Sequence, residues 1–311
     1  MSIILQSFLK PLIPFLRTPH LREISVLCEH QIALDIKGIG YVFKEAKELD
    51  LIYWRTLCHL LANMNGLMFH PESHPILSTS LYDSETEKTH RFEAMLGSCV
   101  ERGISISIRI HQNQPKTFDD FGLEGELKQM LINSILLKKS IMISGGTSSG
   151  KTTLLNLLGA QIPLTQRILS LEDSREIMLP HKNWKAYCVP RHTLKTSVTY
   201  HAMIDHFMRS RPDVILAGEI SVLNSFPILR LLNTGHQSFM CTIHANSALL
   251  AIEEAFQHNL SLAGYSINGI SAYLKKAFDL VIHLHSTQGD QKKIQEILDL
   301  KENKILYTSF S

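Results

Sequence analysis

A short glycine-rich motif constrains the fold of this chain more than any other feature of the sequence. The motif, "GGTSSGKT" at residues 145–152, has the pattern Gly-x-x-x-x-Gly-Lys-Thr and lies between the apolar run "SIMIS" and the leucine-rich stretch "LLNLLGA". A buried strand and a helix are therefore expected to flank it, and in that context the backbone N–H groups of such a loop surround phosphate groups. The expected nucleotide-binding residues are Gly145, Gly146, Thr147, Ser148, Ser149, Gly150, Lys151, Thr152 and Thr153.

Two side chains of this motif have defined chemistry toward a bound triphosphate. Lys151 is long enough to reach the β- and γ-phosphates, and the Thr152 hydroxyl can ligate Mg²⁺. A glycine-rich turn without a ligand is the alternative, but it does not account for the strand before the motif and the helix after it. The sequence therefore predicts a nucleoside triphosphate and Mg²⁺ as ligands.

Carboxylates stand at the ends of two further apolar runs. "RILSLED" ends with Glu172 and Asp173, and "DVILAGE" ends with Glu219, which follows Gly218 where many nucleotide hydrolases carry an aspartate. Functional groups in α/β sheets gather at the carboxyl ends of the strands, so we expect these side chains to approach the phosphates. A hydrolase needs one carboxylate to orient water and usually another near the metal. Taken singly, an acidic residue at a strand end is more often a solvated loop residue or a helix cap. Two such strand ends in one domain with a phosphate-binding loop favour a functional role for Glu219 and Glu172.

The pattern of apolar residues divides the chain into two parts. Beyond residue 122, apolar strand-like runs alternate with helical stretches, which indicates an α/β domain with a largely parallel, buried sheet. Upstream, residues 20–50 read as short half-buried strands, residues 51–66 as a helix that ends at Gly66, and residues 104–110 as a strand with one apolar face. The polar segment at 111–122 is interpreted as a linker. The predicted domains are 1–110 and 123–311.

Composition excludes several classes of protein. The 311 residues include 44% hydrophobic and 19% charged residues with a net charge of +2, which is typical of a globular protein and gives no support for a polyanion binder. The five cysteines are scattered and the 16 histidines are dispersed along the chain, so reduced thiols in the cytoplasm are expected and a metal-chelating protein is not. No apolar run approaches the roughly 20 residues that cross a bilayer.

The N-terminal stretch carries an apolar stripe. Leu5, Phe8, Leu9, Leu12 and Leu16 fall on one face of a helix. We interpret this stripe as the packing face of a helix within the N-terminal domain. A peripheral membrane contact is the alternative.

Four motifs in a fixed order resemble one family. "GGTSSGKTT", "RILSLEDSREI", "RSRPDVILAGEI" and "NTGHQSFMCTIHANS" span residues 145–247 and resemble the type IV secretion traffic ATPases, which are related to type II secretion and pilus motors. The stretches "HPILSTSLYDSETEKTHRFEAMLG" and "GISISIRIHQ" resemble the N-terminal domain of that family. The resemblance implies an α/β fold in which a smaller mixed α/β N-terminal domain precedes a RecA-like P-loop NTPase domain, with ATP and Mg²⁺ as ligands.

The resemblance also implies roles for individual residues. Glu172 and Asp173 fall in an acidic box where a carboxylate helps to organise Mg²⁺, and Glu219 matches the glutamate that orients water. His236 and His244 lie in a histidine box that couples the state of the γ-phosphate to movement. For both histidines, a satisfied core or loop histidine is the alternative explanation.

Arginines form a second group of implied site residues. Arg91 and Arg109 match N-terminal-domain arginines that reach the nucleotide phosphates, where a guanidinium neutralises developing charge. The alternative is that both are solvated arginines on the polar face of a sheet. Arg209 and Arg211 are further candidates for the lining of the site.

The chain departs from the family pattern at two places. Ser221 and Val222 follow "AGEI" where the family often has arginine and then glycine or serine, so a contact of that arginine is lost or is supplied by Arg209 or Arg211. Ser149 stands where glycine is common, and we expect it to narrow the allowed backbone angles and to slow turnover.

The function implied by the resemblance is Mg²⁺-dependent ATP hydrolysis that powers a type IV secretion apparatus, with protein or DNA as cargo. The expected assembly is a hexameric ring at the cytoplasmic face of the inner membrane, with secretion-channel components and other secretion ATPases as partners. Three alternatives stay open: a type II secretion or pilus motor, a DNA-dependent RecA-like ATPase, and a regulatory nucleotide-binding subunit with little turnover. Scattered cysteines argue against the first because many such motors carry a four-cysteine zinc module, and the balanced charge argues against the second.

Overall fold

The chain folds into two compact units. A computed structural model describes residues 3–86, 88–110, 116–189, 198–235, 238–286 and 292–309. Unit 1 contains Met1–Gln114, and unit 2 contains Pro115–Val189 and Val198–Ser311. Among the residues that the structure describes, no helix combines the length and the apolar composition needed to cross a bilayer.

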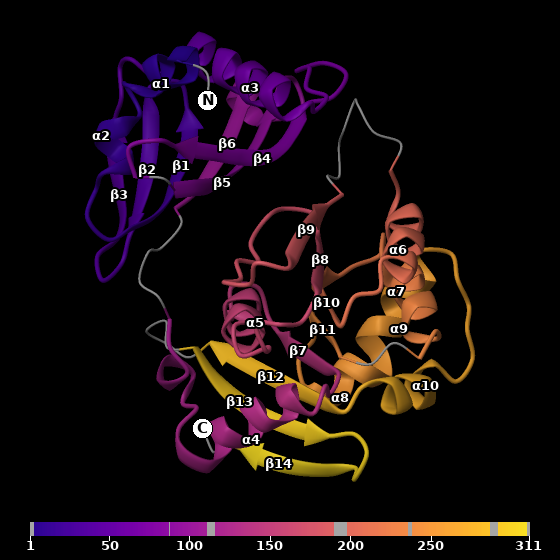
Figure 1. Ribbon diagram of the computed structural model, residues 1–311. Coiled ribbons are helices and arrows are strands. Elements are labelled where there is room, and N and C mark those ends of the chain that lie inside the picture. The colour runs from indigo at the N-terminus through magenta and orange to yellow at the C-terminus, as the bar shows by residue number, and fades with distance from the viewer. Residues whose placement is uncertain are drawn as a thin grey trace. The chain divides into compact units, whose positions relative to one another are not determined.

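Unit 1 is a six-stranded antiparallel sheet with helices packed on one face (Figure 1). The strand order is β3-β2-β1-β6-β5-β4. The strands are β1 (Leu21–Cys28), β2 (Gln31–Ile36), β3 (Gly40–Glu45), β4 (Ile76–Asp83), β5 (Lys88–Leu96) and β6 (Ile104–Arg109), and the helices are α1 (Ile3–Leu9), α2 (Ile13–Leu16) and α3 (Leu51–Asn65). A short 3-10 helix, Glu101–Gly103, precedes β6.

Local signals in the sequence set the limits of α3. The Asp50 side chain accepts a hydrogen bond from the Tyr53 N–H at 2.6 Å, which satisfies one of the free donors at the helix start. Gly66 ends the helix with φ 66°, a left-handed conformation that glycine adopts without steric cost. The helix predicted over residues 51–66, with Gly66 as its end, is confirmed.

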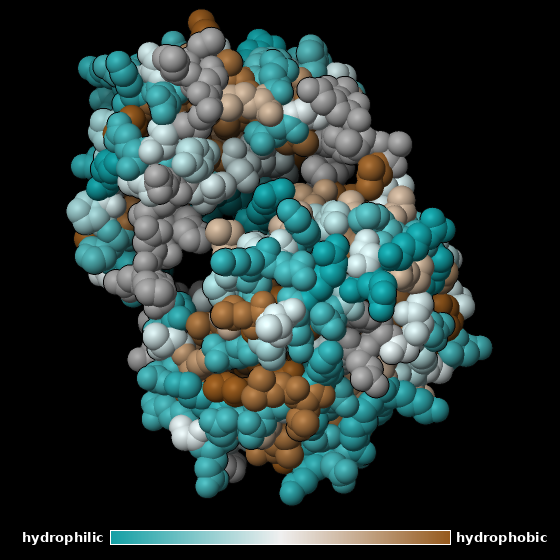
Figure 2. All heavy atoms as spheres, in the orientation of Figure 1, coloured by the Kyte–Doolittle hydropathy of each residue, from teal (hydrophilic) through white to brown (hydrophobic). Residues whose placement is uncertain are grey.

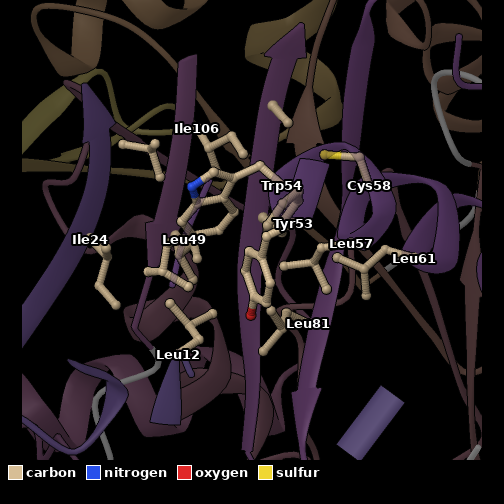
Figure 3. Packing of buried hydrophobic residues seen from close by; sticks show 14 of the residues in the cluster. Leu12, Ile24, Leu49, Tyr53, Trp54, Leu57, Cys58, Leu61, Leu81 and Ile106 are labelled. Atoms are coloured by element: carbon tan, nitrogen blue, oxygen red, sulfur yellow. The ribbon is translucent and has the colours of Figure 1, made fainter. Parts of the chain in front are cut away.

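The core of unit 1 lies between α3 and the sheet. Trp54 is fully buried, and its ring lies beside Ile106 of β6 in Figure 3, with Tyr53 and Leu57 of α3 in the same apolar cluster. Burial of an aromatic side chain of this size removes a large apolar area from water, so α3 fixes the sheet face that it covers. The opposite face carries the polar residues of the strands, as predicted from the alternation in β6.

The N-terminal apolar stripe belongs to this core. Leu5, Leu9, Leu12 and Leu16 are buried, and the ring of Phe8 stacks on Tyr53 with centroids 4.8 Å apart. The packing interpretation of α1 and α2 is therefore confirmed, and their apolar face is occupied within unit 1.

Unit 2 is an eight-stranded, largely parallel sheet with helices on both faces (Figure 1). The order is β14-β13-β12-β7-β11-β10-β8-β9, parallel from β12 to β9 and antiparallel at β13 and β14. The strands are β7 (Ile141–Gly145), β8 (Ile168–Glu172), β9 (Trp184–Cys188), β10 (Val214–Ile220), β11 (Phe239–Ile243), β12 (Leu280–Ser286), β13 (Lys292–Asp299) and β14 (Lys304–Thr308). The predicted parallel α/β architecture is confirmed.

Two apolar cores cover the two faces of this sheet. Residues of α4 (Gly125–Leu136) and α5 (Lys151–Gly159) pack on one face. The other face is covered by α6 (Tyr200–Arg209), α7 (Ser225–Leu232), α9 (Phe256–Leu262) and α10 (Ile270–Ala277), and α8 (Ala248–Leu250) and the π-helical turn Ala251–Ala255 precede α9. In Figure 2, hydrophobic side chains also gather on the visible surface of unit 2, around α4.

The segment predicted as a linker is only partly described. Residues 116–122 pack on unit 2, where Phe118 and Phe121 are buried and a 3-10 helix spans Asp119–Phe121. Residues 111–115 lie outside the described part of the chain. The boundaries 1–110, 111–122 and 123–311 stay a prediction, with the finding that residues 116–122 contribute to the core of unit 2.

An ion pair joins the end of α2 to the turn after β4. Arg17 Nη1 donates to Asp83 Oδ2 at 2.5 Å, and Arg17 Nη2 donates to Asp83 Oδ1 at 3.1 Å and to Glu85 Oε2 at 3.0 Å. Burial raises the pKa of the Asp83 carboxyl, but hydrogen bonds from Arg17, from the Thr86 hydroxyl and from the Glu85 backbone outweigh it and lower the pKa to about 2. The pair therefore holds the N-terminal helices against the sheet across 66 residues of sequence.

Replacement of Arg17 tests this connection. We expect Arg17→Met to lower the free energy of unfolding at pH 7 by about 1–3 kcal/mol, because it leaves a buried carboxylate without its guanidinium partner. The pKa of Asp83 is depressed in the folded state, so the stabilisation is present above about pH 4 and is lost as the pH falls toward about 2. Urea unfolding should show the difference between the two proteins shrinking over that interval. Lys37→Met, at an exposed lysine, is the control, and equal stability of the Arg17 variant and the parent at pH 7 contradicts the assignment.

Candidate nucleotide-binding site

Four neighbouring parallel strands bring the predicted site residues of unit 2 to one edge of the sheet. The strands β7, β11, β10 and β8 lie side by side in that order. Their carboxyl ends carry the glycine-rich loop, His244, Glu219 and Glu172, respectively. Because parallel neighbours end at the same edge, residues far apart in the sequence meet there.

The glycine-rich loop connects β7 to α5, as predicted. Gly145 ends the strand with φ 155°, and a Cβ atom built there would lie 2.6 Å from the Leu284 carbonyl oxygen and 2.6 Å from Ser149 Oγ. Only glycine fits this close approach between the loop and β12. Gly150, with φ 93°, precedes the first residue of α5, so the free N–H groups of the helix start face the loop.

One residue of the loop adopts the left-handed conformation without being glycine. Ser148 has φ 60°, whereas Ser149 is not among the residues with positive φ. The expectation that Ser149 restricts the backbone of the loop is therefore wrong, and the restriction lies one position earlier. Ser149 is instead buried, and its hydroxyl has no hydrogen-bond partner among the described residues.

Lys151, His244 and Glu219 form a continuous line of contacts. Lys151 Nζ donates to the carbonyl oxygens of Gly145 at 3.0 Å and Gly146 at 2.8 Å, and it lies 3.3 Å from His244 Nδ1. On the other side of the ring, His244 Nε2 lies 3.4 Å from Glu219 Oε1. Lys151 is buried, which lowers its pKa, while Glu219 and Glu176 act in the opposite direction. The structure therefore brings together three of the predicted catalytic residues.

Glu172, at the end of β8, is buried. Its Oε1 accepts hydrogen bonds from the backbone N–H groups of Glu176 at 2.9 Å and Ile177 at 2.7 Å, while Oε2 has no partner among the described residues. Burial raises the pKa of Glu172 to about 7, against the effect of the two hydrogen bonds. A Cβ atom at Gly218 would lie 3.0 Å from Glu172 Cγ. Glu172 thus fills the space beside the position where many nucleotide hydrolases carry an aspartate.

The residues predicted to ligate Mg²⁺ fit an ion that is held mainly by phosphate. No group of three or more His, Cys, Asp or Glu residues in the described ranges can hold a metal by itself. Mg²⁺ at nucleotide sites takes one or two protein oxygens together with phosphate oxygens and water. The Thr152 hydroxyl at the start of α5 and the unpartnered Oε2 of Glu172 are oxygens of this kind. Their role as metal ligands stays a prediction.

The roles of the other predicted site residues stay predictions. His236 lies outside the described residues. Arg91 and Arg109 belong to unit 1, where they are register partners on β5 and β6, with Arg91 Nε 3.3 Å from Glu93 Oε1 and Arg109 Nε 3.7 Å from Glu23 Oε2. Their approach to a nucleotide stays a prediction. So does the role of the remaining candidates, which are Asp173 after β8, Arg209 at the end of α6 and Arg211.

Several supporting residues escaped the sequence analysis. Thr242 Oγ1 donates to the Gly218 carbonyl at 2.5 Å, and the Asn224 side chain contacts the backbone on both sides of Ile220. Behind the loop, Ser144 Oγ lies 2.9 Å from Nδ1 of His283, and burial, followed by the charges of His285 and Lys151, lowers the pKa of that histidine to about 4. A polar residue within an otherwise apolar strand was the only signal for Ser144, Thr242 and His283.

The raised pKa of Glu172 predicts a pH-dependent loss of stability. Between about pH 4.5 and pH 7 the folded chain holds a proton that the unfolded chain has released, so the contribution of Glu172 is fully present below this interval and is lost as the pH rises through it. Relative to Glu172→Gln, which is neutral at every pH, the parent protein should lose up to about 3 kcal/mol of unfolding free energy over the interval. Urea titrations without nucleotide and magnesium measure the difference. A difference that is constant from pH 4 to pH 8 contradicts the burial of this carboxyl.

The backbone angle of Ser148 predicts opposite effects of glycine at two neighbouring positions. At Ser148, glycine removes a left-handed strain of about 1–2 kcal/mol, which offsets the greater freedom that glycine gives to the unfolded chain. At Thr147, which is exposed and has no positive φ, only the unfolded-state effect applies. We expect Thr147→Gly to destabilise the chain by about 0.5–1 kcal/mol and Ser148→Gly to be neutral or stabilising in thermal unfolding. Equal losses for both variants contradict the angle.

Comparison with known proteins places the chain among secretion proteins. The family model described as "Type II/IV secretion system protein" matches residues 91–285. The conjugal transfer protein TrbB of Rhizobium radiobacter is 30% identical over 219 residues, and the match covers 68% of this chain and 65% of TrbB. The type IV secretion system protein VirB11 of Bartonella henselae is 27% identical over 286 residues, with 79% of this chain and 78% of VirB11 covered. The chain thus spans less than two thirds of the length of TrbB.

The fold is also similar to that of a solved ATPase. The X-ray structure of the ATPase DotB of Legionella pneumophila superposes with a TM-score of 0.67 at 16% identity, and the match covers 94% of this chain and 81% of DotB. The predicted fold class, a RecA-like P-loop domain with a smaller mixed α/β N-terminal domain, is confirmed. With a family model that matches more than half of its length, the chain belongs to the type II/IV secretion system protein family.

Proposed function

We propose that this chain hydrolyses Mg²⁺-ATP and that the hydrolysis powers a type IV secretion apparatus. The observation that carries the proposal is the line from Lys151 through His244 to Glu219 beside the glycine-rich loop. It supplies a cation for the phosphates and a carboxylate for water within one contact network. Membership of the secretion family and the similarity to TrbB and VirB11 support the assignment to type IV secretion.

The ammonium group of Lys151 is bound by loop carbonyls that a bound phosphate can replace as its hydrogen-bond partners. In the structure, the ammonium group rests on the carbonyl oxygens of Gly145 and Gly146. A triphosphate in the loop presents charged oxygens, which form stronger hydrogen bonds with an ammonium group than neutral carbonyls do. Binding of ATP is therefore proposed to move Lys151 from the carbonyls to the β- and γ-phosphates.

His244 connects this movement to the residue that acts on water. Because the Lys151 ammonium is a donor only, His244 Nδ1 accepts the contact, and the proton of the neutral ring lies on Nε2, toward Glu219 Oε1. Displacement of Lys151 frees His244 Nδ1 and changes the surroundings of Glu219. The histidine is thus proposed to report the presence of the γ-phosphate, while Glu219 orients the attacking water.

The metal is proposed to bind beside these residues. Thr152 and Glu172 would hold Mg²⁺ together with the phosphates, and the ion would neutralise charge on the β- and γ-phosphate oxygens. Glu172 lies ready to supply an oxygen, since its Oε2 is unpartnered in the described part of the chain. Because burial raises the pKa of Glu172 to about 7, a nearby cation would be needed to stabilise the ionised carboxylate that ligates a metal.

Assembly and location follow from the same proposal. We propose a hexameric ring in which Arg91 and Arg109 reach the phosphates and hydrolysis moves the N-terminal domain about the segment 111–122. The proposed partners are components of the secretion channel and other secretion ATPases, and the proposed location is the cytoplasmic face of the inner membrane. The relatives named as type IV secretion and conjugal transfer proteins support these partners.

A regulatory nucleotide-binding subunit is the second candidate. The strained Ser148 in the loop and the replacement of the expected arginine by Ser221 favour it, because both change groups close to the phosphates. This candidate predicts tight binding of ATP with little or no turnover.

Two variants separate binding from hydrolysis. Lys151→Ala is expected to weaken ATP binding and to lower the hydrolysis rate by at least about 100-fold, because it removes the only cation in the line of contacts. Glu219→Gln is expected to lower the hydrolysis rate by a similar factor while ATP binding changes by less than about threefold. Phosphate release and equilibrium binding measure the two effects.

Exposed residues outside the site provide matched controls for both variants. Lys182→Ala and Glu254→Gln remove the same kinds of charge from exposed positions and should leave hydrolysis unchanged. Hydrolysis by Lys151→Ala at the parental rate would reject the proposed function, and ATP binding without turnover by the parent protein would favour the regulatory subunit.

A further inference from the structure

The backbone around Glu219 is not held by regular strand pairing. The ladder between β10 and β8 runs from Val214 to Ala217. The ladder between β10 and β11 pairs Ala217 with Cys241 and then Ile220 with Ile243, so β10 has one residue more than β11 over this interval. Glu219 lies inside this bulge. Its carbonyl and the angle at which its side chain leaves the strand therefore depend on other contacts.

A buried asparagine supplies those contacts. Asn224 Nδ2 donates to the Glu219 carbonyl oxygen at 2.8 Å, and Asn224 Oδ1 accepts from the Ser221 N–H at 2.8 Å. The side chain is almost fully buried, and each end of its amide meets a backbone group of the complementary kind. The partners thus fix the orientation of the amide, and the amide closes a ring around the turn after Glu219.

The two hydrogen bonds of Asn224 to the Glu219 carbonyl and the Ser221 N–H are called the clasp below. The clasp also explains how the turn is stabilised without the arginine expected after "AGEI". Ser221 stands at that position and has no long cationic side chain. Its backbone N–H is instead bound by Asn224, a neutral side chain that begins α7. On the other side of the bulge, Thr242 Oγ1 holds the Gly218 carbonyl. Glu219 is therefore flanked by two backbone groups that polar side chains restrain.

We propose that Asn224 is a positioning residue for Glu219, and that its side-chain amide sets the direction in which the Glu219 carboxylate faces the nucleotide. This inference rests on the proposed function in one respect only, namely that Glu219 orients water. Asn224 acts through the backbone and touches neither the phosphates nor the attacking water. Its loss should therefore lower kcat and leave the binding of ATP nearly unchanged.

The test compares three substitutions in the full chain. Asn224→Asp keeps the acceptor for the Ser221 N–H but places an oxygen against the Glu219 carbonyl, and Asn224→Ala removes both contacts. We expect each to lower kcat for Mg²⁺-ATP by about 10- to 100-fold, with KM changed by less than about threefold. Asn259→Ala is the matched control, because Asn259 makes one longer contact, 3.4 Å, to the Ile220 carbonyl, and it should retain kcat within about threefold.

A double-mutant cycle distinguishes positioning from general destabilisation. If Asn224 acts through Glu219, the Glu219→Gln/Asn224→Ala double variant hydrolyses ATP no more slowly than Glu219→Gln alone. Multiplicative losses in the double variant, or an unchanged kcat in both Asn224 variants, overturn the proposal. A fall in kcat that only follows a fall in the melting temperature, and that Asn259→Ala shares, overturns it as well.

A readout that does not depend on activity separates this inference from the proposed function. Amide hydrogen exchange of residues 218–221 should be at least about 10-fold faster in Asn224→Ala than in the parent, with unchanged exchange in β7 and α5. Unchanged exchange at residues 218–221 rejects the clasp. Faster exchange in Asn224→Ala, together with a parent protein that does not hydrolyse ATP, supports the role of Asn224 and rejects the proposed function.

Discussion

Parallel pairing of β7, β11, β10 and β8 is the constraint on which the site depends. These strands are buried on both faces, so their registers are fixed by the two apolar cores of unit 2 rather than by the site residues themselves. Because all four strands point the same way, Lys151 and His244, 93 residues apart in the sequence, come within 3.3 Å of each other. The sheet thus supplies the geometry, and the polar groups at its edge supply the chemistry.

Polar groups at this edge are compatible with burial because backbone and side chains satisfy most of them. Lys151 donates hydrogen bonds to two loop carbonyls, and one oxygen of Glu172 accepts hydrogen bonds from two backbone N–H groups. The exceptions are Glu172 Oε2, at the end of β8, and Ser149 Oγ, within the loop, which have no partner among the described residues. An unpaired buried polar atom is costly, and a bound ion is one way in which such an atom is satisfied. The Glu172 oxygen fits a bound cation in this way.

Features that depend on local pattern were predictable from the sequence. Turn residues predict the glycine-rich loop and the helix that ends at Gly66. The periodicity of apolar residues predicts the alternation in β6 and the parallel sheet. The structure confirms each of these features. The family, too, could be identified from the order of four motifs, and the match to residues 91–285 confirms it.

Features that depend on backbone angles or on distant contacts were not predictable. The residue that bears the left-handed strain is Ser148 rather than Ser149, because the sequence of a loop does not reveal which position turns back on itself. The pairing of Arg17 with Asp83 joins residues 66 positions apart and leaves no local pattern. Asn224 was missed for a related reason, since the bulge that makes it necessary arises from the registers of β10 with its neighbours.

The proposed function is tested most directly by measuring ATP hydrolysis by the purified chain, with and without Mg²⁺, over a wide range of protein concentrations. We predict hydrolysis that requires Mg²⁺ and a rate per chain that rises with protein concentration, because the proposed assembly would bring arginines to the phosphates. ATP bound at the loop without hydrolysis at any concentration would contradict it.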